Sequence, residues 1–243
     1  MVQCMTSPVI SPLIERNLDA LNQDLESATP QEILAWAIAN IPEGLVQTSA
    51  FSLLVVTDML YRELQPHPPI PVLFLDTLHH FPETLETVDL ALGRYALDLR
   101  VYRAQGVSSR ESFAARYGER LWERNVNRFH SLTKVEPLQR ALREMQVKAW
   151  ITGRRREQAQ TRYEMPILEL DADGRLKINP LANWTRQDVW NYTLKHHVPY
   201  NSLHDKGYTS IGDEPLTTPV APGEHERAGR WRGSVKMECG IHI

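Results

Sequence analysis

Between about residues 30 and 200, short apolar runs of strand length alternate with longer segments of helical character. Parallel strands need a crossover of a dozen or more residues, and that crossover is usually a helix. The alternation therefore predicts an α/β fold with a doubly wound, mainly parallel sheet covered by helices on both faces. We expect this α/β domain to span residues 1–200 and a segment of different character to span residues 201–243.

Two helix starts can be read from the sequence. Thr29-Pro30-Gln31-Glu32 combines a hydroxyl cap, a proline in the first turn and a glutamate that reaches back, and Ser108 with Glu111 forms a second capping pattern. The predicted helices are 30–40, 53–64, 82–95, 108–117, 135–145 and one that Thr185 caps and that ends near His196. The predicted strands are 45–48, 72–75, 96–102, 149–152 and two short ones near Ile167 and Ile178.

Charge and hydropathy narrow the function classes. Apolar residues make up 42% of the chain, enough for a buried core, which excludes a disordered protein. The net charge of −3 gives no overall attraction to nucleic acid or to an anionic membrane, so an anionic ligand has to be held by a local basic cluster. The chain shows neither a run of roughly 20 apolar residues nor a secretory signal pattern. We therefore expect a cytoplasmic protein with neither nucleic acid nor membrane as partner.

The two cysteines, Cys4 and Cys239, lie near opposite ends of the chain. A disulfide between them is one interpretation, and a cytosolic chain with two free thiols is the favoured one. Two cysteines are too few for a four-cysteine metal or iron–sulfur site within one chain.

Ligands of doubly wound sheets bind beyond the carboxyl ends of the strands. The first such turn, after the strand that contains Val46, reads Thr48-Ser49-Ala50-Phe51-Ser52. Small hydroxyl residues at a strand-to-helix turn present hydroxyl and backbone N–H groups to a phosphate, although an ordinary helix cap has the same composition.

The turns after Leu75 and Ile151 carry the next candidates. Asp76 and Thr77 follow the former, and His79 and His80 come next but offer too few ligands for a metal site. Gly153-Arg154-Arg155-Arg156 follows the latter. Guanidinium groups bind phosphate or sulfate through paired donors, so this run at the ligand edge indicates an anion site, against the alternative of a solvated face. Other candidate cations are Lys134, Arg162, Arg227, Arg230 and Arg232.

The segment 201–243 is rich in glycine, proline and charge, which predicts a flexible C-terminal tail. Cys239 lies there, in Lys236-Met237-Glu238-Cys239-Gly240-Ile241-His242. A cysteine in a polar tail is accessible, and nearby cations favour its thiolate form. Such a thiol suits covalent catalysis followed by exchange with a second thiol protein.

These pieces in this order resemble the assimilatory sulfonucleotide reductases, most closely the thioredoxin-dependent phosphoadenylyl-sulfate (PAPS) reductase branch. The matching segments are Thr48 to Ser52, Asp76-Thr77 with Phe81-Pro82-Glu83-Thr84, Lys134-Val135-Glu136-Pro137-Leu138, Gly153 with Arg155-Arg156-Glu157-Gln158, Gly207-Tyr208-Thr209-Ser210-Ile211-Gly212-Asp213, and Glu238-Cys239-Gly240-Ile241-His242.

The resemblance implies an adenine-nucleotide α-hydrolase-like fold, related to the PP-loop enzymes. It implies that Cys239 attacks the sulfur of PAPS, that adenosine bisphosphate leaves, and that thioredoxin then releases sulfite. Nucleotide binding falls on Thr48, Ser49, Ala50, Phe51, Ser52, Asp76, Thr77 and Gly153. Binding of sulfate or phosphate falls on Lys134, Arg155, Arg156, Arg162, Arg227 and Arg230. Glu238 and His242 would tune the thiol. A homodimer is also implied.

The family has a second branch, the adenylyl-sulfate (APS) reductases, in which two cysteine pairs typically bind a [4Fe–4S] cluster. Here Phe129-His130 replaces the first pair, and Asp213 and Leu216 replace the second. The resemblance therefore implies an enzyme without cluster or metal. Because Pro215 and the run 226–231 resemble the APS-type tail, a cluster-free APS reductase stays an alternative.

Two further alternatives come from other function classes. A PP-loop ATP pyrophosphatase usually carries a glycine-rich Ser-Gly-Gly-x-Asp-Ser turn, which Thr48 to Ser52 does not supply. A catalytically silent nucleotide-binding or redox-sensing module would have no need of Cys239 for turnover. Loss of sulfite production on changing Cys239 to serine separates the reductase from both.

Overall fold

The computed structural model describes residues 12–232, 236 and 238–242. The strands are β1 (Leu45–Thr48), β2 (Val72–Leu75), β3 (Leu99–Tyr102), β4 (Ala149–Ile151), β5 (Leu168–Leu170) and β6 (Leu176–Ile178). They form one sheet in the order β3-β2-β1-β4-β6-β5. Neighbouring strands in it are parallel except for the pair β6 and β5. These two are antiparallel because a turn at 171–175, too short for a crossover, joins them.

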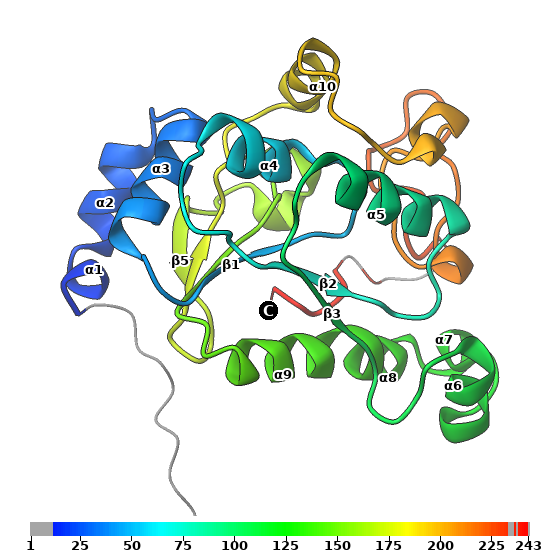
Figure 1. The fold of residues 1–243 in the computed structure, drawn as a ribbon. Coiled ribbons are helices and arrows are strands. Elements are labelled where there is room, and N and C mark those ends of the chain that lie inside the picture. The colour runs from blue at the N-terminus through cyan, green and yellow to red at the C-terminus, as the bar shows by residue number, and fades with distance from the viewer. Residues whose placement is uncertain (1–11, 233–235, 237, 243) are drawn as a thin grey trace, which may run out of the picture.

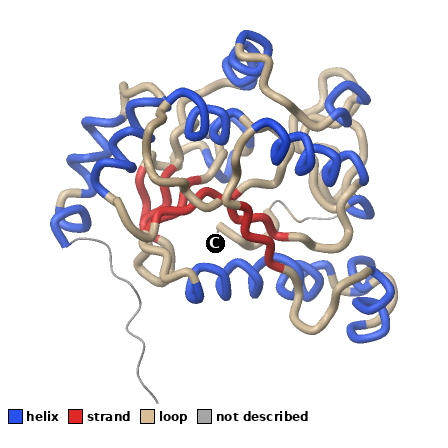
Figure 2. The backbone as a smooth tube through the Cα atoms, in the orientation of Figure 1, coloured by secondary structure: helices blue, strands red, loops and turns tan. Residues whose placement is uncertain are grey.

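Helices cover both faces of the sheet, as Figures 1 and 2 show. They are α1 (Pro12–Arg16), α2 (Leu18–Leu25), α3 (Pro30–Asn40), α4 (Val55–Asp58), α5 (Pro82–Arg94), α6 (Arg110–Tyr117), α7 (Leu121–Arg124), α8 (Val126–His130), α9 (Glu136–Glu144) and α10 (Arg186–Lys195). The predicted doubly wound, mainly parallel α/β fold is confirmed. No helix among the described residues combines the length and apolar character that crossing a membrane requires.

Alternation along the strands divides the core into two layers, because neighbouring strand residues point to opposite faces. On one face Phe74 and Ile151 join the apolar sides of α3, α4, α5 and α10. On the other face Val46, Leu73 and Trp150 pack against α9. The two layers together hold the strand ends in place, and the candidate residues lie at these ends.

The helix boundaries test the capping predictions. The box of Thr29 and Glu32 is present. The second box is formed by Ser109 and Ser112, so the prediction of Ser108 and Glu111 was wrong by one residue at the cap. Helix α4 begins two residues after the predicted 53 and continues as a π-helical turn at 59–63.

The C-terminal segment requires a correction within its described part. We expected a flexible tail, but residues 201–232 fold back over the strand ends. The backbone N–H of Glu214 donates to the carbonyl of His79, and the side-chain amide of Asn201 donates to the Thr84 hydroxyl. Ile211 and Leu203 pack against Phe81. Buried apolar side chains hold the segment, which its glycine and proline content did not indicate.

A buried carboxylate ties three helices together. Asp58 accepts hydrogen bonds from Arg62 and from the hydroxyls of Tyr95 (2.7 Å) and Tyr192 (2.9 Å), which come from α4, the end of α5 and α10. Burial by itself raises the pKa of Asp58, but these hydrogen bonds outweigh it and lower that pKa.

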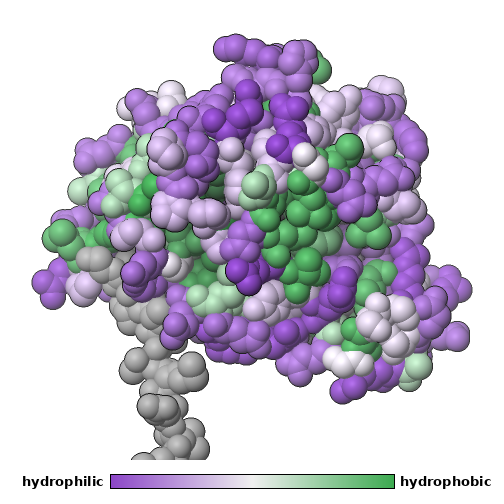
Figure 3. Space-filling model, viewed as in Figure 1, coloured by the Kyte–Doolittle hydropathy of each residue, from purple (hydrophilic) through white to green (hydrophobic). Residues whose placement is uncertain are grey.

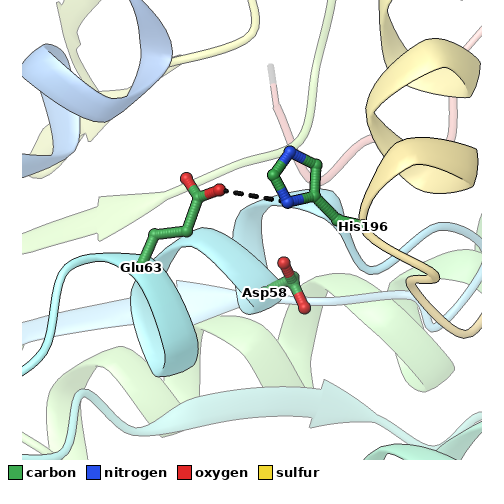
Figure 4. Close-up of side chains that lie close together, drawn as sticks. All are labelled: Asp58, Glu63 and His196. Atoms are coloured by element: carbon green, nitrogen blue, oxygen red, sulfur yellow. Dashed lines mark ion pairs between the residues drawn. The ribbon is translucent and has the colours of Figure 1, made fainter.

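Glu63 and His196 lie beside this carboxylate, 3.4 Å from each other, and Figure 4 shows all three side chains. The three residue types suit a cation. The guanidinium of Arg62, however, contacts both oxygens of Asp58 and lies 3.0 Å from Nδ1 of His196. Its positive charge occupies the place of a metal ion, so the cluster is structural.

We predict that Asp58→Ala lowers the free energy of unfolding by about 3 kcal/mol, because two buried tyrosine hydroxyls and Arg62 lose their acceptor. Urea denaturation measures the change. Glu123→Ala is the control: Glu123 pairs with the exposed Arg120, and its loss should cost under about 1 kcal/mol. Equal losses in the two variants would contradict this role for Asp58.

Candidate active site

A pocket of about 280 Å³ lies where the carboxyl ends of β1 and β4 meet. The strand order reverses direction at this point, since the chain runs from β1 outward to β3 and then returns to β4 on the other side of β1. Crossovers on opposite sides leave a crevice between the two strand ends. The turn at 48–53, the turn at 152–155 and the segments 209–212 and 238–242 line this pocket.

The turn after β1 brings four of its five predicted residues to the pocket: Thr48, Ser49, Ala50 and Ser52. Phe51 is the exception and corrects the prediction. Its φ of +50° turns the side chain into the core, where it is fully buried edge-on against Phe74. The Ser52 hydroxyl lies 3.0 Å from Nε2 of His204, which the sequence analysis did not single out.

The turn after β2 does not reach the pocket with the expected residues. Asp76 accepts a hydrogen bond from Arg103 (2.7 Å) and another from the backbone of Leu78, and Thr77 is buried away from the pocket lining. Leu78 has a φ of +63°, so the chain bends sharply here. His80 lines the pocket instead and stacks on Phe74, and burial lowers its pKa.

The arginine run after β4 divides by direction. Arg155 lines the pocket and is held by two oxygens of Glu226, at 2.9 and 2.8 Å. Arg156, next in sequence, turns away to Glu26, just after α2, and to the carbonyl of Met165, so it does not join the predicted anion site. A 3₁₀ turn begins at Arg156 and separates the two directions. Gly153 lies in the lining as predicted.

Three more predicted arginines converge from distant segments. Arg162 donates to both oxygens of Glu238 at 2.8 Å, and Arg227 donates to the same carboxylate at 3.1 Å. Arg230 donates to the Ser210 hydroxyl and the Ile211 carbonyl, while its buried Nε finds no partner among the described residues. The pocket therefore collects positive charge that internal groups satisfy only in part.

Burial shapes the charge of these groups. It lowers the pKa of Arg227 to about 10, with Arg162 as the second cause, while Glu238 and Cys239 act in the opposite direction. Burial also lowers the pKa of Arg230 against the charges of Asp213 and Cys239. Both guanidiniums therefore lie within electrostatic reach of the Cys239 sulfur and would gain from a bound anion.

Cys239 lies in the pocket lining with partial exposure. Glu238 before it and His242 after it also line the pocket, so the predicted tail residues come together there. Gly240 has a φ of +93°, which lets the chain turn beside the thiol. Figure 1 shows this last part of the chain, coloured red, between the sheet and α9.

Lys134 belongs to a buried network that the sequence analysis did not assemble. Its ammonium donates to Asp213, and the His130 ring lies 3.4 Å from the same carboxylate. Burial would raise the pKa of Asp213, but Lys134 and His130 hold it well below the usual range. Phe129 and Leu216 pack into one apolar cluster nearby. Phe129, His130, Asp213 and Leu216, the positions to which the resemblance assigns the cluster cysteines of the APS branch, thus come together in this network and the cluster beside it.

Several pocket residues were missed as site candidates. Thr209, Ser210 and Ile211 line the pocket, and the run from Gly207 to Asp213 had carried the family resemblance. Glu226 was missed because the sequence does not reveal which carboxylate partners an arginine. Gly212 also lines the pocket. The absence of a side chain there leaves room for Arg230, because a Cβ would collide with the Arg230 guanidinium.

Chemically, the site offers one thiol, hydroxyl and amide groups at a helix start, and several guanidiniums around one crevice. Such a site binds a ligand with more than one anionic group and exposes it to a sulfur nucleophile.

Comparisons with known proteins agree with this chemistry. The model of the phosphoadenosine phosphosulfate reductase domain matches residues 46–219. Phosphoadenosine phosphosulfate reductase of Emericella nidulans is 49% identical over 93% of this chain and 75% of its own length. The enzyme of Saccharomyces cerevisiae is 45% identical over 94% of this chain and 90% of its own.

Solved structures give the same answer. The phosphate complex of PAPS reductase from Candida auris superimposes with a TM-score of 0.77 at 41% identity, covering 87% of this chain and 100% of that one. FMN adenylyltransferase of Candida glabrata, at 18% identity and a TM-score of 0.58 over 86% of this chain and 73% of its own, shares the fold. The chain is an oxidoreductase that belongs to the phosphoadenosine phosphosulfate reductase family.

Proposed function

We propose that this enzyme reduces PAPS to sulfite and adenosine 3′,5′-bisphosphate in sulfate assimilation, with thioredoxin as electron donor. The observation that carries the proposal is the position of Cys239, a thiol in the lining of an arginine-rich crevice at the strand switch point. The names of the relatives support the substrate.

In the first half-reaction the Cys239 thiolate attacks the sulfur of the sulfo group. The bond from that sulfur to the bridging oxygen breaks, and its electron pair leaves with adenosine bisphosphate. Cys239 then carries –SO₃⁻. Sulfo oxygens repel a thiolate, so Arg162, Arg227 and Arg230 would neutralise them as the sulfur is approached.

In the second half-reaction a thiolate of reduced thioredoxin attacks the Cys239 sulfur. Sulfite leaves with the electron pair of the broken bond, and a mixed disulfide forms. The second thioredoxin thiol attacks its partner sulfur in that disulfide and returns Cys239 as a thiol. The two electrons thus come from the dithiol. The described residues hold no second cysteine, which supports the need for an external donor.

The nucleotide would bind at Thr48, Ser49, Ala50, Ser52 and Gly153, which share the pocket. Lys134 and Arg155 would hold its phosphates. We no longer assign binding to Phe51, Asp76, Thr77 or Arg156, for the geometric reasons given above. Glu238 fixes the chain beside the thiol through Arg162, so we assign it a positioning role.

We also propose that the enzyme works without a cofactor and in the cytoplasm. Phe129, His130, Asp213 and Leu216 supply no thiolate at the positions that hold an iron–sulfur cluster in the related branch. A reducing compartment would keep the Cys239 thiol available between turnovers. The assignment of Cys4 lies outside the described residues.

A homodimer is the proposed assembly, through the face formed by α5 and the edge strand β3. Leu85 and Leu92, seven residues apart on one side of α5, are 46 and 43% exposed, and Val101 of β3 is 41% exposed; Figure 3 shows apolar surface gathered over this part of the molecule. The opposite edge is covered, since Asn22 of α2 bonds both backbone groups of Leu168 in β5. Asp98 and Arg100 flank Leu99, so a second β3 running antiparallel about Leu99 would meet opposite charges.

We predict that Cys239→Ser abolishes sulfite release from PAPS with thioredoxin, because a serine hydroxyl does not provide the thiolate nucleophile. Intact-protein mass spectrometry should find an added SO₃ on the wild type without reductant and none on the variant. Cys4→Ser is the matched control and should keep the adduct. Sulfite production by the serine variant would refute the reductase, and assays with APS alongside would separate the two substrates.

The two adjacent arginines should behave differently. Arg155→Ala should weaken adenosine 3′,5′-bisphosphate binding by about 1–3 kcal/mol, because a charged hydrogen-bond donor is lost from the pocket. Arg156→Ala should leave the dissociation constant unchanged, since its side chain faces α2. Isothermal titration calorimetry measures both. Equal effects of the two substitutions would contradict the assignment.

Light scattering tests the dimer. The wild type should be a dimer and the double variant Leu85→Glu with Leu92→Glu a monomer, because charged groups would be buried at the contact. Leu194→Glu, at an exposed leucine of α10 outside the proposed contact, is the control and should stay dimeric. A monomeric wild type or a dimeric double variant would reject this interface.

A further inference from the structure

The chain end makes a specific contact beyond the cysteine. The His242 ring stacks on the Trp150 ring of β4, with centroids 5.5 Å apart and planes 8° apart. The Lys177 ammonium of β6 lies 5.4 Å from the centre of the same Trp150 ring and donates to the His242 carbonyl at 3.2 Å. Strands β4 and β6 pair with Trp150 opposite Lys177. Two neighbouring strands thus form one binding surface for His242. We call this surface, made of Trp150 and Lys177, the seat.

Lys177 is difficult to explain by packing alone. It is 4% exposed, and burial lowers its pKa. A buried ammonium is unfavourable unless a partner compensates it. Its side-chain hydrogen bond among the described residues goes to the chain end. The charges of Glu169, its cross-strand neighbour, and of Asp171 offset part of that cost. The hydrogen bond to the His242 carbonyl is the contact that links this lysine to the end of the chain.

Cys239 lies between two anchors as a result. On its N-terminal side Arg162 holds both oxygens of Glu238. On its C-terminal side Ile241 packs into the cluster around Leu138, and His242 occupies the seat. Burial, followed by the charges of Arg154 and Arg162, holds the pKa of His242 well below its usual range, so the ring is neutral and suited to stacking.

We propose that Trp150 and Lys177 are positioning residues that act through His242: they hold Cys239 over the bound nucleotide for the first half-reaction and release it for the second. The inference rests on the proposed function. In the docked position Cys239 is only partly exposed and faces a pocket of about 280 Å³, a position that restricts its access to the dithiol of another protein. The docking therefore favours sulfonation and opposes discharge by thioredoxin.

Two rates measured separately test this proposal. The first is the appearance of SO₃ on Cys239 with saturating PAPS and no reductant. The second is the loss of SO₃ from pre-loaded enzyme on adding reduced thioredoxin, both followed by intact-protein mass spectrometry. Trp150→Leu should slow the first rate at least tenfold and leave the second unchanged or faster. Trp150→Phe, which keeps an aromatic face, should stay within about threefold of the wild type for both.

Lys177→Met provides a second test in case Trp150→Leu impairs folding. Methionine fills a similar volume without the buried charge. It should again slow sulfonation selectively, with an unchanged or raised melting temperature. Lys206→Met, at an exposed pair with Glu83, is the control and should change neither rate. Equal slowing of both half-reactions, or no slowing in Trp150→Leu and Lys177→Met, would overturn the proposal.

An activity-independent readout separates failure of the seat from failure of the proposed function. Iodoacetamide should alkylate Cys239 several-fold faster in Trp150→Leu and Lys177→Met than in the wild type, because an undocked thiol is exposed. Unchanged alkylation would reject the seat even if both variants were slow. Absence of SO₃ on the wild type would reject the proposed reaction, while faster alkylation would still support the seat.

Discussion

The pocket depends on bringing like charges together in a buried place. Arg155, Arg162, Arg227 and Arg230 come from segments up to 75 residues apart in sequence and converge on one crevice. Mutual repulsion and lost hydration would disperse them if nothing opposed it. Glu226 and Glu238 supply part of the opposing charge. A bound anionic ligand would supply the remainder, so that the stability of this part of the fold and the binding of the proposed substrate would be coupled.

The sheet makes this convergence geometrically feasible. Reversal of strand order at β1 leaves the carboxyl ends of β1 and β4 without a crossover between them. The two turns at these strand ends supply different binding groups. The turn after β1 supplies hydroxyls and backbone N–H groups, and the turn after β4 supplies guanidinium groups. The C-terminal segment closes the third side through contacts with the turn after β2, such as Glu214 to His79. Cys239, which follows this segment in the chain, therefore lies in the lining of the pocket.

Periodicity was sufficient to predict the sheet and its doubly wound class, and strand-end logic placed the turns after β1 and β4, which line the pocket. They failed where direction is decided by a single backbone angle. Phe51 has a positive φ, which apolar side chains rarely adopt and which the sequence does not indicate, and its side chain points into the core. Asp76 is held by Arg103, a partner that the sequence does not reveal. The 3₁₀ turn after Arg155 likewise sent Arg156 outward. Short helices such as α7 and α8 carry too few turns for a periodic signal.

Gly212 shows how tightly two positions of the site depend on each other. Its backbone does not need glycine for conformational freedom; what it needs is empty volume, because the guanidinium of Arg230 fills the space of a Cβ. An alanine at position 212 would force the Arg230 guanidinium to shift. A side chain shorter than arginine at position 230 would leave a void beside the Gly212 backbone. The effects of substitutions at positions 212 and 230 are therefore expected to be non-additive, because each side chain sets the space that the other can occupy.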